Sequence, residues 1–172
     1  MTTLSLPDRT LLAQLFYEQE EIHGVVQTVD YEDVLRKHDF SASVARKIAD
    51  QLDPGRTGNI PREYALRTLG LPSSYQPQLI IPRDVNILSS DMGPCQQYSV
   101  IHMVRHNMKY LPDMKEVVSR IKTRLDAVYG PLWHVFIIRG QYWAYYSHDT
   151  RTGLVFKCDD YIYLMYRSPT ES

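Results

Sequence analysis

The sequence is poor in the features that mark several large functional classes. It holds only two cysteines, Cys95 and Cys158, and they form no metal-type cluster. They could be joined by a disulfide, but two cysteines without a recognisable secretory signal favour a reducing compartment. The net charge is -1, which gives no general attraction to nucleic acid or to anionic membranes. No apolar run approaches the roughly 20 residues of a membrane span. We therefore expect a cytoplasmic protein that does not insert into membranes.

Signatures of catalysis are also missing. The sequence contains no glycine-rich phosphate-binding loop, and nothing near Cys95 provides a base for a nucleophilic thiol. His102 and His106 have the i, i+4 spacing of a zinc pair, but no glutamate follows the first histidine and no third ligand stands at a telling distance. We expect solvent-facing histidines on a helix and a protein that is not an enzyme.

Aromatic and β-branched residues are concentrated between Trp133 and Tyr166. This stretch breaks into four runs punctuated by glycine, aspartate and threonine: Trp133–Arg139, Gln141–His148, Thr152–Cys158 and Tyr161–Arg167. The pattern predicts a strand meander with tight turns. Several runs are apolar at consecutive positions, so both faces of the sheet need cover, with helices on one side and something else on the other.

The first part of the chain has helical periodicity. Four helices are predicted within residues 8–69, with Asp8, Asp30 and either Ser41 or Ser43 as N-caps and Pro61 in the first turn of the fourth. The pattern is two successive helix–loop–helix units. Because each pair is too small to bury its own apolar face, we expect the pairs to pack on each other.

The remaining segments complete a two-domain plan. Residues 70–83 contain three prolines and no periodicity, which is typical of a linker. A strand over Asp84–Ser90 and two helices then precede the meander, which predicts an α+β domain with both helices on one face of an antiparallel sheet. We thus expect an all-α domain over 1–69, a linker over 70–83 and an α+β domain over 84–172.

The loop from Asp53 to Tyr64 resembles the second loop of an EF-hand pair. It has an acid in the first position, Gly58 in the sixth at the sharp turn, and Ile60 in the eighth, where paired loops form a short sheet. Three residues are candidate calcium ligands: Asp53, Thr57 and Asn59.

The same loop lacks other calcium ligands. Gly55 stands at the third position and Tyr64 at the twelfth, where calcium takes a bidentate carboxylate, and Glu63 is one residue early. Two interpretations therefore stay open, a weak calcium site and a structural EF-hand that has lost its metal. The partner loop, taken as 22–33 with Val29 opposite Ile60, has no acid at its first, third or fifth position and is expected to be a scaffold.

The predicted strand over Gln141–His148 carries a candidate partner-binding surface. One face presents Tyr142, Ala144, Tyr146 and His148, and the other presents Trp143, Tyr145 and Ser147. At a sheet edge, such a strand can accept an added strand, with backbone hydrogen bonds giving affinity and side-chain pockets giving specificity. An ordinary core or dimer strand is the alternative.

Two short motifs resemble a known family. Tyr-Gly-Pro-Leu-Trp-His at 129–134 and Tyr-Tyr-Ser-His-Asp-Thr at 145–150 are similar to runs of the small dynein light chains, and the element order agrees from about Asp84 to Ser168. An EF-hand pair before such a domain resembles the tegumental calcium-binding, allergen-like proteins of parasitic flatworms.

The resemblance implies a symmetric homodimer in which each protomer lends a strand to the other's sheet, with His134 at the interface. It also implies that short extended peptides add along Tyr142–His148 and that a carboxylate near the second helix, here Asp113, reads the peptide. The chain departs from the light-chain pattern where Trp143 replaces a glycine, Ala144 a serine and Met114 a lysine. These departures bear on peptide specificity more than on the fold.

Together these patterns predict a calcium-responsive adaptor with a weak or degenerate calcium site and protein partners, among them the dynein complex or the cytoskeleton. The alternative is a structural component of the tegument or the membrane cytoskeleton in which both the metal site and the groove are vestigial.

Overall fold

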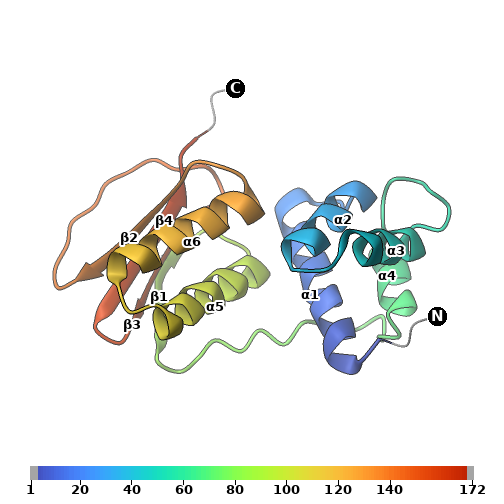
Figure 1. Ribbon diagram of the computed structural model, residues 1–172, viewed down its shortest axis with the longest axis horizontal. Coiled ribbons are helices and arrows are strands. Elements are labelled where there is room, and N and C mark those ends of the chain that lie inside the picture. The colour runs from blue at the N-terminus through green and yellow to red at the C-terminus, as the bar shows by residue number, and fades with distance from the viewer. Residues whose placement is uncertain (1–3, 170–172) are drawn as a thin grey trace. The chain divides into compact units, whose positions relative to one another are not determined.

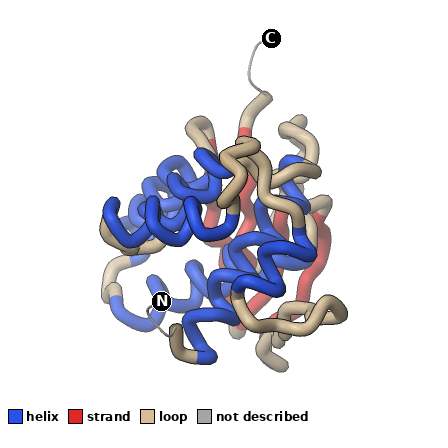
Figure 2. Tube along the Cα trace, turned by 90° about the vertical axis from the view of Figure 1, so that its right-hand side faces the viewer, coloured by secondary structure: helices blue, strands red, loops and turns tan. Residues whose placement is uncertain are grey.

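The chain forms two compact units in a computed structural model that describes residues 4–169. The division falls between Gln78 and Leu79, within the predicted linker. The first unit is helical and the second combines helices with one sheet, as Figures 1 and 2 show for each unit. None of the helices in the described residues has the length and apolar character needed to cross a membrane.

The first unit contains four helices: α1 (Leu6–His23), α2 (Thr28–Lys37), α3 (Ala42–Leu52) and α4 (Arg62–Thr68). The predicted cap Ser41 is confirmed, since its hydroxyl accepts from the N–H of Val44. The predicted caps Asp8 and Asp30 are wrong: both lie inside the first turn of their helices, which begin after Ser5 and Gln27. An acid is favourable in a first turn as well as at a cap, because the helix dipole is positive there, so the two patterns are hard to separate.

Tyr31 of α2 packs against α1 in the core of the first unit. Its side chain is fully buried, its hydroxyl donates to the carbonyl of Leu12 at 2.7 Å, and its ring meets Phe16 edge-on at 6.0 Å. Further fully or nearly fully buried side chains come from all four helices: Leu15, Leu35, Ala45, Ala49, Leu52, Ala65 and Leu66.

The second unit contains four strands and two helices: β1 (Val85–Ser90), α5 (Pro94–Tyr110), α6 (Met114–Tyr129), β2 (Trp133–Arg139), β3 (Leu154–Cys158) and β4 (Tyr161–Arg167). The strands are antiparallel in the order β1-β3-β4-β2. Both helices lie on one face of this sheet (Figure 1). The expected α+β arrangement is therefore confirmed for this unit.

The predicted strand over Gln141–His148 is wrong for the isolated chain. Residues 141–149 are all described and none belongs to a strand. Instead of forming a hairpin with the residues after Gly140, β2 pairs with β4 from Trp133↔Arg167 to Arg139↔Tyr161. A high aromatic content indicates that a segment can form a strand, but it does not identify the strand with which that segment would pair.

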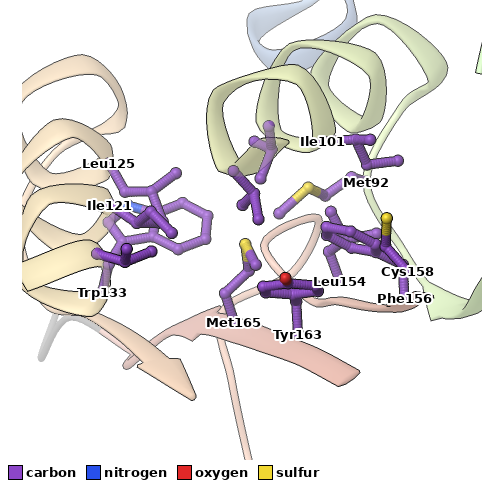
Figure 3. Close-up of a cluster of buried hydrophobic side chains, with 13 residues drawn as sticks. Met92, Ile101, Ile121, Leu125, Trp133, Leu154, Phe156, Cys158, Tyr163 and Met165 are labelled. Carbon is purple, nitrogen blue, oxygen red and sulfur yellow. The ribbon is translucent and has the colours of Figure 1, made fainter. Parts of the chain in front are cut away.

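The core of the second unit lies between the sheet and the two helices. Trp133 is fully buried against Ile121 and Leu125 of α6, whereas Phe156 of β3 lies nearer Ile101 of α5 (Figure 3). Alternate residues of each strand point inward, so the sheet supplies a second set of core side chains: Leu154, Cys158, Tyr163 and Met165. The other face of the sheet receives no helix of this unit.

We predict that Leu125→Ala lowers the free energy of unfolding by about 2–5 kcal/mol, because it leaves a cavity beside Trp133. Urea unfolding followed by Trp fluorescence measures the change. The matched control is Leu88→Ala, whose side chain is 48% exposed at the irregular point of the β1–β3 pairing. An equal loss in both variants would contradict the packing described above.

Candidate functional site

The segment between β2 and β3 contains most of the partner-binding residues predicted from the sequence. We call residues 141–148 the strap; Figure 1 shows it within a long connection without helix or strand. The strap leaves β2 at Gly140, whose φ of 95° lies in the region that favours glycine. Of the residues that the structure describes, none pairs with the free edge of β2, which lies opposite β4.

Side-chain exposure along the strap follows a two-residue alternation except at Ala144, which is exposed like its two neighbours. Tyr142, Tyr146 and His148 are half-buried, while Trp143 is 89% exposed and Tyr145 is fully exposed. The strap thus shows part of the side-chain alternation of a strand without the strand pairing of one.

Tyr146 holds the strap against the outer face of the sheet, the face without helices. Its ring stacks on Tyr166 at 4.4 Å and 13°, and Tyr166 also stacks on His134 at 5.0 Å. Burial raises the pKa of the Tyr146 hydroxyl. Beside this stack Phe136 remains 45% exposed, and the Nε2 atom of His134 is 2.7 Å from the Ser168 hydroxyl. His134, predicted at a dimer interface, therefore lies in an aromatic patch that the chain covers only in part.

The residues after the strap are tied firmly to the sheet. Arg167 of β4 donates to one carboxylate oxygen of Asp149 from Nε at 3.2 Å and from Nη2 at 2.7 Å, and it donates to the Tyr129 carbonyl from Nη1 at 2.8 Å. Asp91 accepts from the backbone N–H groups of Arg151 and Gly153, both at 2.8 Å. These contacts fix the point at which the chain returns from the strap to the sheet.

Asp113 lies at the start of α6. Its carboxylate accepts from the N–H of Lys115 at 3.4 Å, which makes it the N-cap of that helix. The side chain is solvent-exposed and retains acceptor capacity beyond this long hydrogen bond.

In the first unit, two loops pair through their backbones. Gln27 and Asn59 form a bridge, Thr28 N–H donates to the Gly58 carbonyl at 2.9 Å, and Ile60 N–H donates to the Val26 carbonyl at 2.9 Å. The predicted pairing of Ile60 with Val29 is wrong. Because α2 begins at Thr28, Val29 lies within a helix and is 68% exposed.

Asp53 is buried at the centre of these loops. Its Oδ1 accepts from Thr57 N–H at 2.9 Å and lies 3.0 Å from the Thr57 hydroxyl, and its Oδ2 accepts from Gly58 N–H at 2.9 Å and from the Thr28 hydroxyl at 2.8 Å. The Thr57 N–H has the largest effect and, with the other donors, lowers the pKa of Asp53 to about 2 against the opposing effect of burial. The carboxylate is therefore ionised and well satisfied by the protein.

The loop does not fit a tight calcium site. Calcium takes six to eight oxygens, including a bidentate carboxylate, and of the side chains at the first, third, fifth and twelfth positions only Asp53 is acidic. The Thr57 hydroxyl oxygen is already 2.9 Å from the Asn59 carbonyl oxygen. Asp53, Thr57 and Asn59 thus lie together, but their oxygens are engaged with one another and with N–H groups.

One cluster of side chains could not be predicted, because one of its residues is far from the other two in the sequence. Asp84, Cys158 and Asp159 bring carboxylate and thiol atoms within 4.8 Å of one another. Arg105 pairs with one of the two carboxylates, since its Nη1 is 2.5 Å from Asp84 and 3.5 Å from the sulfur of Cys158. Burial raises the pKa of the Cys158 thiol. His102 lines the same surface pocket, and its Nε2 has no hydrogen-bond partner among the described residues.

Comparison with known proteins identifies the second unit. The family model described as dynein light chain type 1 matches residues 84–168. Over 65 residues the chain is 32% identical to "Dynein light chain 1, cytoplasmic" of Candida glabrata, which covers 38% of this chain and 74% of that protein. The chain belongs to the dynein light chain family. The strap, β2 and Asp113 are accordingly parts of a dynein light chain domain.

The longer relatives come from flatworms. The chain is 25% identical over 147 residues to the Schistosoma mansoni "Tegument antigen", covering 83% of this chain and 68% of that protein. It is 32% identical over 93 residues to "Antigen Sm21.7" of the same organism, covering 52% and 50%. The dynein light chain-like domain of a Fasciola hepatica calcium-binding protein has 24% identity and a TM-score of 0.47, covering 52% of this chain and 97% of that one. The predicted resemblance to flatworm tegumental proteins with a light chain domain is confirmed.

We predict that Asp149→Asn lowers the free energy of unfolding by about 1–3 kcal/mol, since it weakens a partly buried, charge-assisted contact with Arg167. Chemical unfolding monitored by circular dichroism provides the measurement. Asp160→Asn is the control, because its pairing with Arg139 is 3.8 Å long and largely exposed and should change stability by less than about 0.5 kcal/mol. Similar losses in both variants would show that Asp149 does not anchor the chain.

Proposed function

We propose that this chain is a non-enzymatic adaptor that joins other polypeptides through the strap and the free edge of β2. The observation that carries the proposal is an extended, aromatic segment without strand pairing in residues 4–169, next to a strand whose second edge is open. Backbone groups in such a position gain hydrogen bonds when another chain adds to the sheet. Membership of the dynein light chain family supports the same role.

A second copy of the chain is the first partner that this geometry suits. Each protomer would place its strap beside β2 of the other, in an isologous contact that also covers the aromatic patch around His134, Phe136 and Tyr166. The remaining edge of the strap, from Tyr142 to His148, would then accept an extended peptide, with Asp113 available to a basic or polar group of that peptide. Partners of the dynein complex or the cytoskeleton are the class we propose, in the cytoplasm or beneath a tegument membrane.

We predict that Tyr145→Pro weakens dimerisation on the order of tenfold or more. Proline has no N–H group, so each protomer loses one intermolecular hydrogen bond. A symmetric dimer therefore loses two such bonds, each worth about 1 kcal/mol of dimerisation free energy. The Tyr145 side chain is fully exposed within the chain, so folding should be unaffected. Sedimentation equilibrium measures the dissociation constant.

The matched control is Tyr145→Ala, which keeps the N–H group and removes the ring. It should dimerise more tightly than the proline variant. A wild-type protein that stays monomeric at high micromolar concentration, or equal dimerisation of the two variants, would refute pairing through the strap.

We predict that Trp143→Gly improves the binding of peptides that recognise dynein light chains, because a large exposed ring obstructs the edge at which a peptide backbone must approach. Fluorescence anisotropy with a labelled peptide gives the affinity. Trp143→Phe, which keeps a large ring, should show a smaller gain. Unchanged peptide affinity in the glycine variant would show that Trp143 does not obstruct binding.

We also propose that the first unit is an EF-hand pair with a degenerate calcium loop. Asp53, Thr57 and Asn59 are the residues that would supply oxygens to a weakly held ion. The engagement of both Asp53 oxygens with protein donors favours a second candidate function, that of a structural tegument or membrane-cytoskeleton component. In that case the first unit would be a fixed spacer, and only the light chain domain would bind partners.

A further inference from the structure

The paired loops of the first unit are closed by the chain's own donors at the position where an EF-hand would hold its ion. A carboxylate has about four acceptor sites. Asp53 has two donors close to each oxygen: the N–H and hydroxyl of Thr57 at Oδ1, and the N–H of Gly58 with the hydroxyl of Thr28 at Oδ2. Its acceptor capacity is therefore used within the protein.

Thr28 is the one donor of this set that comes from the opposite loop. Its hydroxyl donates to Asp53 at 2.8 Å, while its N–H donates to the Gly58 carbonyl at 2.9 Å. Since Thr28 is the first residue of α2, the start of that helix fixes its position. A single residue thus connects α2 with the end of α3, where Asp53 is the C-cap.

Thr57 performs a similar task within the second loop. Its hydroxyl oxygen lies 3.0 Å from Asp53 Oδ1 and 2.9 Å from the Asn59 carbonyl oxygen. These are the oxygens of the first and seventh loop positions, which a calcium ion would otherwise draw together. One hydroxyl proton can serve either acceptor, so the two oxygens share it and need no cation between them.

We propose that the Thr28 and Thr57 hydroxyls replace the ion, so that the first unit keeps its loops closed without calcium and does not open or close in response to it. This inference rests on the assignment of the unit as an EF-hand pair. An ion at Asp53 would have to displace the Thr28 hydroxyl while the N–H groups of Thr57 and Gly58 still face the carboxylate. With one acidic side chain at the four principal ligand positions, the loop offers little compensation.

Amide hydrogen exchange of the full chain tests the proposal. The N–H groups of Thr57, Gly58 and Ile60 are all hydrogen-bonded within the paired loops and should be equally protected in chelator and in millimolar calcium. Protection that arises only when calcium is added would overturn the proposal. This measurement does not involve the strap, so its failure is distinct from failure of partner binding.

Thr28→Val supplies the matched perturbation, since it preserves the shape of the side chain and removes its hydroxyl. Exchange at Thr57 and Gly58 should accelerate about fivefold, the factor that corresponds to one hydrogen bond of ordinary strength. Thr28→Ser keeps the donor and should exchange like the wild type. Equal exchange in the valine and serine variants would show that Thr28 does not close the loops, whatever the calcium concentration.

Discussion

The pairing of β2 with β4 is the constraint on which the light chain domain depends. Seven residues of β2 lie opposite seven of β4, and β4 is occupied on its other side by β3. The chain after Gly140 therefore cannot form a hairpin on that side of β2. It crosses to Asp149, which Arg167 holds at the end of β4. The open edge of β2 and the unpaired strap arise from this one choice of neighbours.

Much of this domain could be predicted because its signals are local. Trp133–Arg139 and Tyr161–Arg167 match β2 and β4 to the residue, since dense aromatic and β-branched runs end at Gly140 and at the Asp159–Asp160 turn. The strap contains the same kind of residues, yet it forms no strand. A strand needs hydrogen bonds from a second segment that is not adjacent in the sequence, so the residue types of the strap suggested a strand but could not supply its pairing.

The first unit shows the same limit in a different form. Ser41 was predictable as a cap because its partner, the N–H of Val44, is three residues away. The register of the paired loops was not, since it depends on α2 starting at Thr28 rather than after Asp30. The contact of Thr28 with Asp53 joins residues 25 positions apart. Only the folded chain shows that the first position of the calcium-like loop already has its donors.

The two units thus differ in whether the polar groups discussed above find hydrogen-bonding partners within the described chain. In the first, backbone N–H groups and two hydroxyls converge on Asp53, and two loops meet through Gln27 and Asn59. In the second, the edge of β2 and the strap remain open in the described chain, beside aromatic rings that are only partly buried. Unpaired backbone groups and exposed aromatic surface are both stabilised by a further strand, which is the basis for proposing that partners bind the second unit. The Asp53 carboxylate already has its donors within the first unit, whereas the second edge of β2 pairs with no strand among the described residues.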